Sequence, residues 1–136
     1  LFLKQLPAGV PGRILNVAST ASFIPGPLMS VYYASKAQLL SFGLALDCEL
    51  EGKGVSVTTL CPGPTATEFQ SRAGQHGVRL LKTPVMDAKT VAWKGFVGLM
   101  RGKRVVVPGL LNKLSVISMK VLPQRLLLPV IKFIHQ

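Results

Sequence analysis

The sequence predicts an α/β fold: the second half of a doubly wound parallel sheet, followed by a helical C-terminal tail. Short apolar runs typical of buried strands alternate with longer stretches of helical periodicity, which is the pattern of parallel strands joined by helices. Only three such runs occur, too few for a parallel sheet covered on both faces. The first long helix also has an apolar side that needs a partner.

The first part of the chain predicts one strand and one long helix. Residues 1–6 have the pattern of the end of an amphipathic helix, and the apolar run 13–19 predicts a buried strand after a turn rich in Pro and Gly. A loop over 20–29 leads to a helix from Ser30, the expected N-cap, to about Gly52. The expected buried face of this helix consists of Ala37, Leu40, Leu44 and Cys48.

Two more strands are expected further along. The β-branched run 55–60 predicts a strand that ends abruptly at Cys61-Pro62-Gly63-Pro64, and RVVVP (104–108) predicts the last one. The other segments are, in chain order, a short helix over 65–71, a loop over 72–86, a helix over 88–100 capped by Asp87, and a tail over 109–136 made of two helical pieces broken at Pro123 and Pro129.

Composition limits the classes of protein. With 136 residues the chain holds one domain at most, and its 49% hydrophobic residues favour a buried core over disorder. The formal net charge is +11, and no acidic residue follows Asp87. Because the basic tail is rich in apolar residues and poor in aromatic ones, it favours a membrane surface or a protein contact over nucleic acid.

The two cysteines do not predict a metal site. Cys48 and Cys61 show neither a CxxC spacing nor histidines at a metal-ligand spacing. We expect both to be buried free thiols of a cytoplasmic protein, because nothing in the sequence indicates secretion.

Tyr32 and Lys36 are candidates for proton transfer. They are four residues apart in the first turns of the expected helix, so they share one face. A phenol is a weak acid at neutral pH, and a nearby ammonium group favours its ionised form. A Tyr-x-x-x-Lys spacing also occurs by chance on many solvated helices, so the interpretation depends on what lies around it.

Polar and small residues at the strand ends provide that context. Ser19 follows the first strand, at the carboxyl edge where open α/β sheets place their sites, and its hydroxyl is suited to hold a carbonyl oxygen. It could equally be a cap of the strand, as could Thr20 or Ser22. Gly63 would let a flat ring approach the backbone, or belong to an ordinary Pro-Gly turn.

Together these motifs resemble the short-chain dehydrogenase/reductase family, whose domain is Rossmann-like. The matching segments are NVAS (16–19), YYASKA (32–37) and CPGPTAT (61–67), and the resemblance covers residues 1–108. It implies that Tyr32 is the general acid/base, that Lys36 supports it and holds the nicotinamide ribose, and that Ser19 orients the substrate oxygen. The residues that would line the nicotinamide end of NAD or NADP are Pro62, Gly63, Thr65 and Thr67.

The sequence also departs from the family pattern. The Gly-rich turn that binds the dinucleotide is absent, so we expect the chain to begin inside a longer domain and to bind cofactor weakly by itself. The residue that selects NAD or NADP belongs to that missing half. Asn16 is not the family's catalytic Asn, and Tyr33 is one residue out of register with Lys36. The resemblance implies a homo-oligomer for the complete protein.

The expected function is an NAD(P)-dependent oxidoreductase that interconverts an alcohol and a ketone or aldehyde. The apolar loop 23–29 between Ser19 and Tyr32 suggests a small, lipophilic substrate. The alternative is a non-catalytic binding protein, or one associated with a membrane surface, that retains these motifs as relics. The tail 109–136 could be an interfacial membrane helix, a cover over the substrate cleft or a dimer contact.

Overall fold

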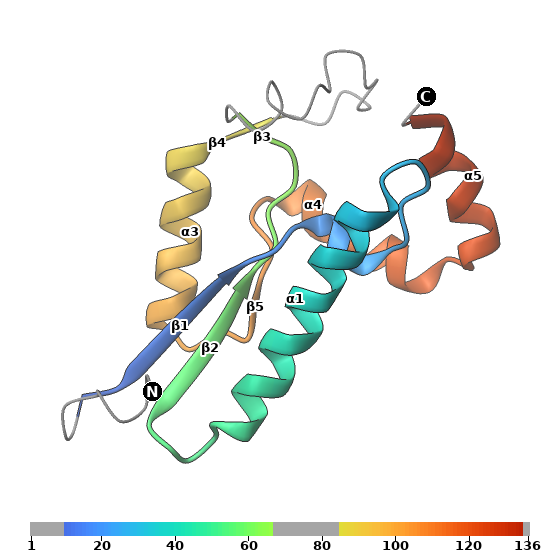
Figure 1. The fold of residues 1–136 in the computed structure, drawn as a ribbon. Coiled ribbons are helices and arrows are strands. Elements are labelled where there is room, and N and C mark those ends of the chain that lie inside the picture. The colour runs from blue at the N-terminus through green and yellow to red at the C-terminus, as the bar shows by residue number, and fades with distance from the viewer. Residues whose placement is uncertain (1–9, 67–84, 135–136) are drawn as a thin grey trace.

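A computed structural model describes residues 10–66 and 85–134 (Figure 1). Its main sheet is parallel, with the strand order β1-β2-β5, where β1 is Gly12–Val17, β2 is Val55–Leu60 and β5 is Val105–Val106. Gly12 pairs with Val55, Val17 with Leu60, and Thr59 with Val105. The predicted parallel α/β sheet is therefore confirmed, and β2 has the bounds that the sequence predicts. The last strand is shorter than the predicted range 104–108.

Two helices cover opposite faces of this sheet, as Figure 1 shows: α1 (Ser30–Glu49) and α3 (Ala88–Met100). Alternate side chains of β2 point to opposite faces. Val57 packs with Leu46 and Leu50 on the α1 side, whereas Leu60 lies against Gly95 of α3. A Cβ atom at Gly95 would lie 2.7 Å from Leu60 Cδ2, so the absence of a side chain lets α3 approach the sheet closely.

The buried face of α1 agrees with the predicted one at Leu40 and differs from it in the second half of the helix. Leu40, Gly43 and Asp47 are buried, whereas Leu44 and Cys48 are exposed. A Cβ atom at Gly43 would collide with Thr59 Oγ1, so the helix lies closest to the sheet at a glycine. A buried stripe that contains a glycine and a carboxylate is invisible to a search for recurring apolar residues.

Three smaller predictions are corrected as well. The N-cap of α1 is Met29 and not Ser30, and it makes no side-chain capping bond. Both cysteines are free, but only Cys61 is buried. Thr65–Ala66 forms strand β3, paired with β4 (Met86–Asp87), where the sequence predicted a helix and a loop; the rest of those segments, 67–84, lies outside the described residues.

Asp87 caps α3 as predicted. Its carboxylate accepts a hydrogen bond from the backbone N–H of Thr90 at 3.0 Å, in the first turn of the helix. This bond satisfies one of the backbone donors that have no partner within the helix, and the negative charge favours the helix N-terminus.

The tail folds as two helices, α4 (Leu110–Val121) and α5 (Gln124–Ile134). The predicted break at Pro123 is confirmed, because α4 ends before it and α5 begins directly after it. Pro129, in contrast, lies inside α5 and does not end the helix. Val116 of α4 and Ile131 of α5 are buried, so each helix turns one side towards the rest of the molecule.

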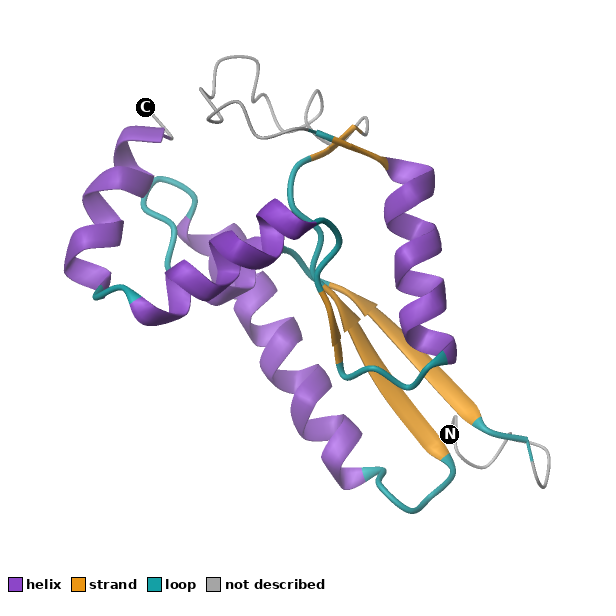
Figure 2. Cartoon of the chain, turned by 180° about the vertical axis from the view of Figure 1, so that it is seen from behind, coloured by secondary structure: helices purple, strands orange, loops and turns teal. Residues whose placement is uncertain are grey.

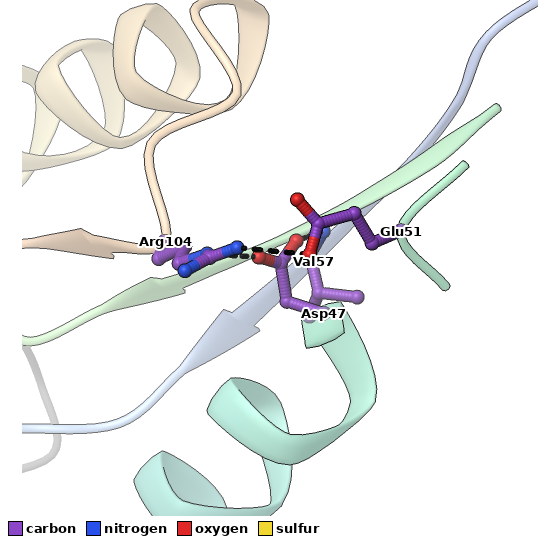
Figure 3. A network of polar contacts seen from close by, with 4 residues as sticks. All are labelled: Asp47, Glu51, Val57 and Arg104. Carbon is purple, nitrogen blue, oxygen red and sulfur yellow. Dashed lines mark hydrogen bonds and ion pairs between the residues drawn. The ribbon is translucent and has the colours of Figure 1, made fainter. Parts of the chain in front are cut away.

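A polar network joins α1 to the sheet, as Figure 3 shows. The Asp47 carboxylate accepts hydrogen bonds from the backbone N–H of Val57 at 2.8 Å and from Arg104 Nε at 2.7 Å. Arg104 also lies 3.6 Å from Glu51. β5 pairs with only the last part of β2, at Thr59 and Leu60. The Val57 N–H therefore finds no carbonyl of β5 to accept its hydrogen bond, and the Asp47 carboxylate accepts it instead.

Candidate active site

The segments that follow β1 and β2 lie together at the carboxyl edge of the sheet. Backbone hydrogen bonds of 2.8 Å continue the pairing past the strands, from Ala18 N–H to the Leu60 carbonyl and from Thr20 N–H to the Pro62 carbonyl. Figure 2 shows the loops after the three strands gathering at this edge, beside α4. Ser19 and the Pro62-Gly63 turn are thus neighbours, as expected for parallel strands.

Lys36 joins the first turns of α1 to this edge. Its ammonium nitrogen donates a hydrogen bond to the Val17 carbonyl at 3.3 Å, and it lies 5.8 Å from the centroid of the Tyr32 ring. One cation is therefore near both the end of β1 and the phenol. An ammonium has three N–H donors, so the bond to Val17 uses one of the three.

The hydroxyl groups near the end of β1 have different surroundings. Ser19 caps a short 3-10 helix, η2 (Thr20–Phe23), and its Oγ accepts a hydrogen bond from Ala21 N–H at 3.1 Å. This bond occupies one lone pair and leaves the hydroxyl hydrogen for another partner. Ser22 is buried and donates to the Lys36 carbonyl at 2.8 Å, so its hydrogen is used within the fold. Of these two serines, Ser19 is the better suited to bind a substrate oxygen.

Tyr33 lies in a different environment from Tyr32. The two rings meet edge to face, with centroids 5.8 Å apart, and the Tyr33 ring covers Gly26 so closely that a Cβ atom there would collide with it. Burial, and to a smaller extent Tyr32, raises the pKa of Tyr33 above its ordinary value. Tyr33 therefore stays protonated at neutral pH and is unsuited to be the base.

The turn after β2 is closed by residues from two elements. Thr65 Oγ1 donates a hydrogen bond to the Gly63 carbonyl at 2.9 Å. The Asn112 side chain of α4 lies over Gly63, where a Cβ atom would be 2.6 Å from its Cγ, and it donates to the Pro108 carbonyl at 2.8 Å. Sequence patterns do not single out Asn112, because no motif includes it. Thr67 lies outside the described residues.

Cys61 lies beside these residues but does not provide a reactive thiol. Burial raises its pKa to about 11, although a hydrogen bond donated to the sulfur by the Ser19 backbone and the charge of Lys120 act in the opposite direction. At neutral pH the group is a protonated thiol, which is a poor nucleophile and a poor metal ligand. The polar chemistry at this edge therefore rests on hydroxyl, phenol and ammonium groups.

An apolar cavity of about 550 Å³ lies beside the start of α1, and Ser19, Tyr32 and Lys36 are not among its lining residues. It is lined by the loop Ser22–Pro27, the first turns of α1 and Leu128 of α5. Tyr33 belongs to the lining, and its ring separates the cavity from the Tyr32 ring that it meets edge to face. The predicted apolar loop therefore faces a space large enough for a small organic molecule.

Comparisons with known proteins agree with these motifs. A model of the short chain dehydrogenase family matches residues 1–77. Two relatives are each 40% identical: a probable oxidoreductase, EphD, of Mycobacterium tuberculosis over 68 residues, and 17-beta-hydroxysteroid dehydrogenase type 3 of Mus musculus over 67 residues. These alignments cover 50% and 49% of this chain, but 12% and 22% of the relatives.

A solved structure extends the similarity beyond the region that those two sequences match. The short-chain dehydrogenase from Sphingobium yanoikuyae in complex with NADPH is 31% identical, with a TM-score of 0.63. The alignment covers 82% of this chain and 46% of that protein. The chain thus spans about half of this neighbour and less than a quarter of the two curated relatives.

Proposed function

The chain belongs to the short-chain dehydrogenase family, and from this premise we propose that it carries the substrate-binding half of an NAD(P)-dependent oxidoreductase. The reaction would interconvert an alcohol and a ketone or aldehyde. The observation that supports the proposal is the position of the Lys36 ammonium, which lies 3.3 Å from the Val17 carbonyl, two residues before Ser19, and 5.8 Å from the centroid of the Tyr32 ring.

Two observations support the view that a preceding half completes the domain. The edge of β1 opposite β2 has no strand beside it among the described residues, and Val17 near its end is 52% exposed. The Sphingobium yanoikuyae structure is longer than this chain, because the alignment covers 82% of this chain and 46% of that one. We therefore propose that residues 1–108 complete a sheet whose other strands pair with β1, and that residues 109–136 are a tail added to it.

The donor set fits the nicotinamide and ribose end of the cofactor. Lys36 has N–H donors beyond the one bonded to Val17, and these suit ribose hydroxyl groups. Tyr32 would bind the same ribose, and Pro62, Gly63 and Thr65 would line the nicotinamide side, with Thr67 following them in sequence. When bound, the cofactor supplies the hydride that the carbonyl carbon gains or the alcohol loses.

The protein's own part in the reaction is to move one proton and to position the substrate. The Ser19 hydroxyl donates a hydrogen bond to the substrate oxygen. In reduction the Tyr32 phenol gives its proton to that oxygen, and in oxidation the phenolate takes the proton back. Lys36, whose ammonium lies 5.8 Å from the centroid of the Tyr32 ring, would hold the ribose beside the phenol.

We further propose that the substrate is lipophilic. The supporting observation is the 550 Å³ cavity, whose lining includes Phe23, Ile24 and Leu128. The apolar part of the substrate would occupy this cavity while its oxygen lies between Ser19 and Tyr32. Leu128 comes from α5, so the tail would also cover part of the substrate site.

Replacing Leu128 by serine tests the substrate class. In the complete enzyme we expect the KM for a bulky apolar ketone to rise by about tenfold, because the substrate loses contact with the half-buried Leu128, and full burial of a leucine contributes about 1.5–3 kcal/mol. The KM for a small ketone such as acetone should change little. Steady-state oxidation of NAD(P)H measures both values.

The matched control is Leu126→Ser. Leu126 lies on the same helix but is 59% exposed and outside the cavity lining. If the two substitutions raise the KM for the bulky ketone equally, or if neither does, the cavity is not where the apolar part of the substrate binds.

A further inference from the structure

The outer surface of α4 is apolar, although its inner side already packs on the protein. Val116 is buried, whereas four residues at spacings of four, three and four form a continuous stripe on the opposite side. Each of them is more than half exposed: Leu110, Leu114, Ile117 and Val121. A helix whose solvent side carries such a stripe exposes apolar surface that needs a partner.

The next helix repeats the pattern. In α5 the inner residue Ile131 is buried, while Leu126, Val130 and Phe133 form a second exposed stripe at spacings of four and three. Both views of the fold show α4 and α5 together at the side of the molecule away from α3 (Figure 1 and Figure 2). We call these two stripes the outer face of the tail.

Cations flank this face, and acidic residues are missing from its sequence. Lys113 lies beside the first stripe, and Arg125 and Lys132 are seven residues apart on α5. All three are exposed, whereas the ammonium of Lys120 lies 5.0 Å from the Phe23 ring centroid and is turned towards the fold. No Asp or Glu occurs anywhere between residues 88 and 136. Apolar stripes flanked only by cations are typical of helices that lie in the interface of an anionic bilayer.

We propose that the outer face of the tail docks on the surface of a membrane that contains anionic lipids. The apolar stripes would enter the boundary between headgroups and acyl chains, and the flanking cations would contact lipid phosphates. A second copy of the chain is a poorer occupant, because it would bring the same positive charges against this face. No helix among the described residues has both the length and the apolar character to span a bilayer.

The arrangement would also connect the membrane with the cavity. Leu128 lines the cavity from the inner side of α5, while Leu126 and Val130 lie on the outer face of the same helix. A helix in this position would have the lipid phase on one side and the cavity on the other. The docking itself does not depend on the redox activity.

Co-sedimentation of the full chain with lipid vesicles tests the proposal. We expect binding to vesicles of phosphatidylcholine with phosphatidylglycerol, much weaker binding to pure phosphatidylcholine, and a loss of binding as salt is raised. The double variant Arg125→Gln/Lys132→Gln should bind the anionic vesicles about 25-fold more weakly, since each cation near the surface contributes about fivefold. This pair avoids Lys120, which lies 5.0 Å from the Phe23 ring centroid within the fold.

A second test variant removes apolar side chains, and each test variant has a control at exposed positions outside the tail. Lys89→Gln/Lys94→Gln removes the same charge from exposed positions of α3 and should retain most of the binding. Ile117→Ser/Phe133→Ser should weaken binding at least about tenfold, because apolar contact area is lost. Phe42→Ser, at a position of α1 that is 54% exposed, should not.

Three results would overturn the proposal. One is equal binding to both kinds of vesicle, and another is no binding to either by a chain whose circular dichroism shows it folded. The third is concentration-dependent self-association without lipid that Ile117→Ser abolishes, which would assign the face to a second copy of the chain.

Discussion

Replacing Tyr32 by phenylalanine is expected to lower the turnover number of the complete enzyme by about 100- to 10,000-fold, the usual contribution of a positioned acid or base. The substitution removes the oxygen that would exchange the proton and keeps the ring that lies near Lys36 and Tyr33. Substrate binding should change much less than turnover. Steady-state rates in both directions, with thermal unfolding to check the fold, measure the effect.

Tyr33→Phe is the matched control for that experiment. Tyr33 is the next residue in α1, has its pKa raised by burial, and lines the apolar cavity. Losing its hydroxyl should leave the turnover number within a few-fold of the wild type. If Tyr33→Phe abolished turnover and Tyr32→Phe did not, the assignment of the proton-transferring phenol would be wrong.

The largest effect on stability is expected from Asp47→Ala. The substitution leaves the buried N–H of Val57 without its acceptor, which costs about 1–3 kcal/mol of unfolding free energy, and it also removes the partner of Arg104. Asp47→Asn keeps an oxygen for the Val57 N–H and should destabilise less than Asp47→Ala. Urea unfolding at neutral pH measures the free energy of each variant.

Glu51→Ala distinguishes the contribution of the Asp47–Val57 hydrogen bond from that of the Arg104–Glu51 ion pair at the surface. Glu51 is exposed and lies 3.6 Å from an Arg104 side chain that is 57% exposed, so solvent screens the pair. This variant should unfold close to the wild type. Equal midpoints for Asp47→Ala and Glu51→Ala would mean that the hydrogen bond to Val57 does not stabilise the fold.

The strands were the most predictable part of the fold. β2 consists of β-branched and apolar residues bounded by Gly54 and by Pro62, and its ends in the structure are those of the pattern. The last strand shows the limit of this reasoning. RVVVP has the composition of a strand throughout, but only Val105–Val106 pairs with β2, because strand length depends on the partner as well as on propensity.

Helix faces were less predictable, because packing decided them. The apolar residues Leu44 and Cys48 suggested that their side of α1 faces the sheet. In the structure the side with Gly43 and Asp47 faces it, because Gly43 allows close approach and Asp47 accepts a hydrogen bond from β2. A carboxylate that replaces a strand carbonyl cannot be found from local sequence.

The candidate site likewise contains residues that local patterns predict and one residue that they do not. The strand order places Ser19 and the Pro62-Gly63 turn side by side, and the helical spacing places Lys36 near Tyr32, so local patterns predicted these two neighbourhoods. Asn112 follows Gly63 by 49 residues and meets it only through tertiary packing. Local sequence patterns carry no information on such a contact.

The most direct test of the central claim is a label-transfer experiment with the complete protein. The protein is incubated with NADPH or NADH deuterated at the transferable position of the nicotinamide and with a lipophilic ketone, and the alcohol is analysed by mass spectrometry. If this chain provides the substrate half of an oxidoreductase, deuterium appears on the carbinol carbon with wild-type protein and falls to background with Tyr32→Phe. Binding of both dinucleotide and ketone without any transfer of the label would contradict the account and favour a non-catalytic protein that retains the motifs.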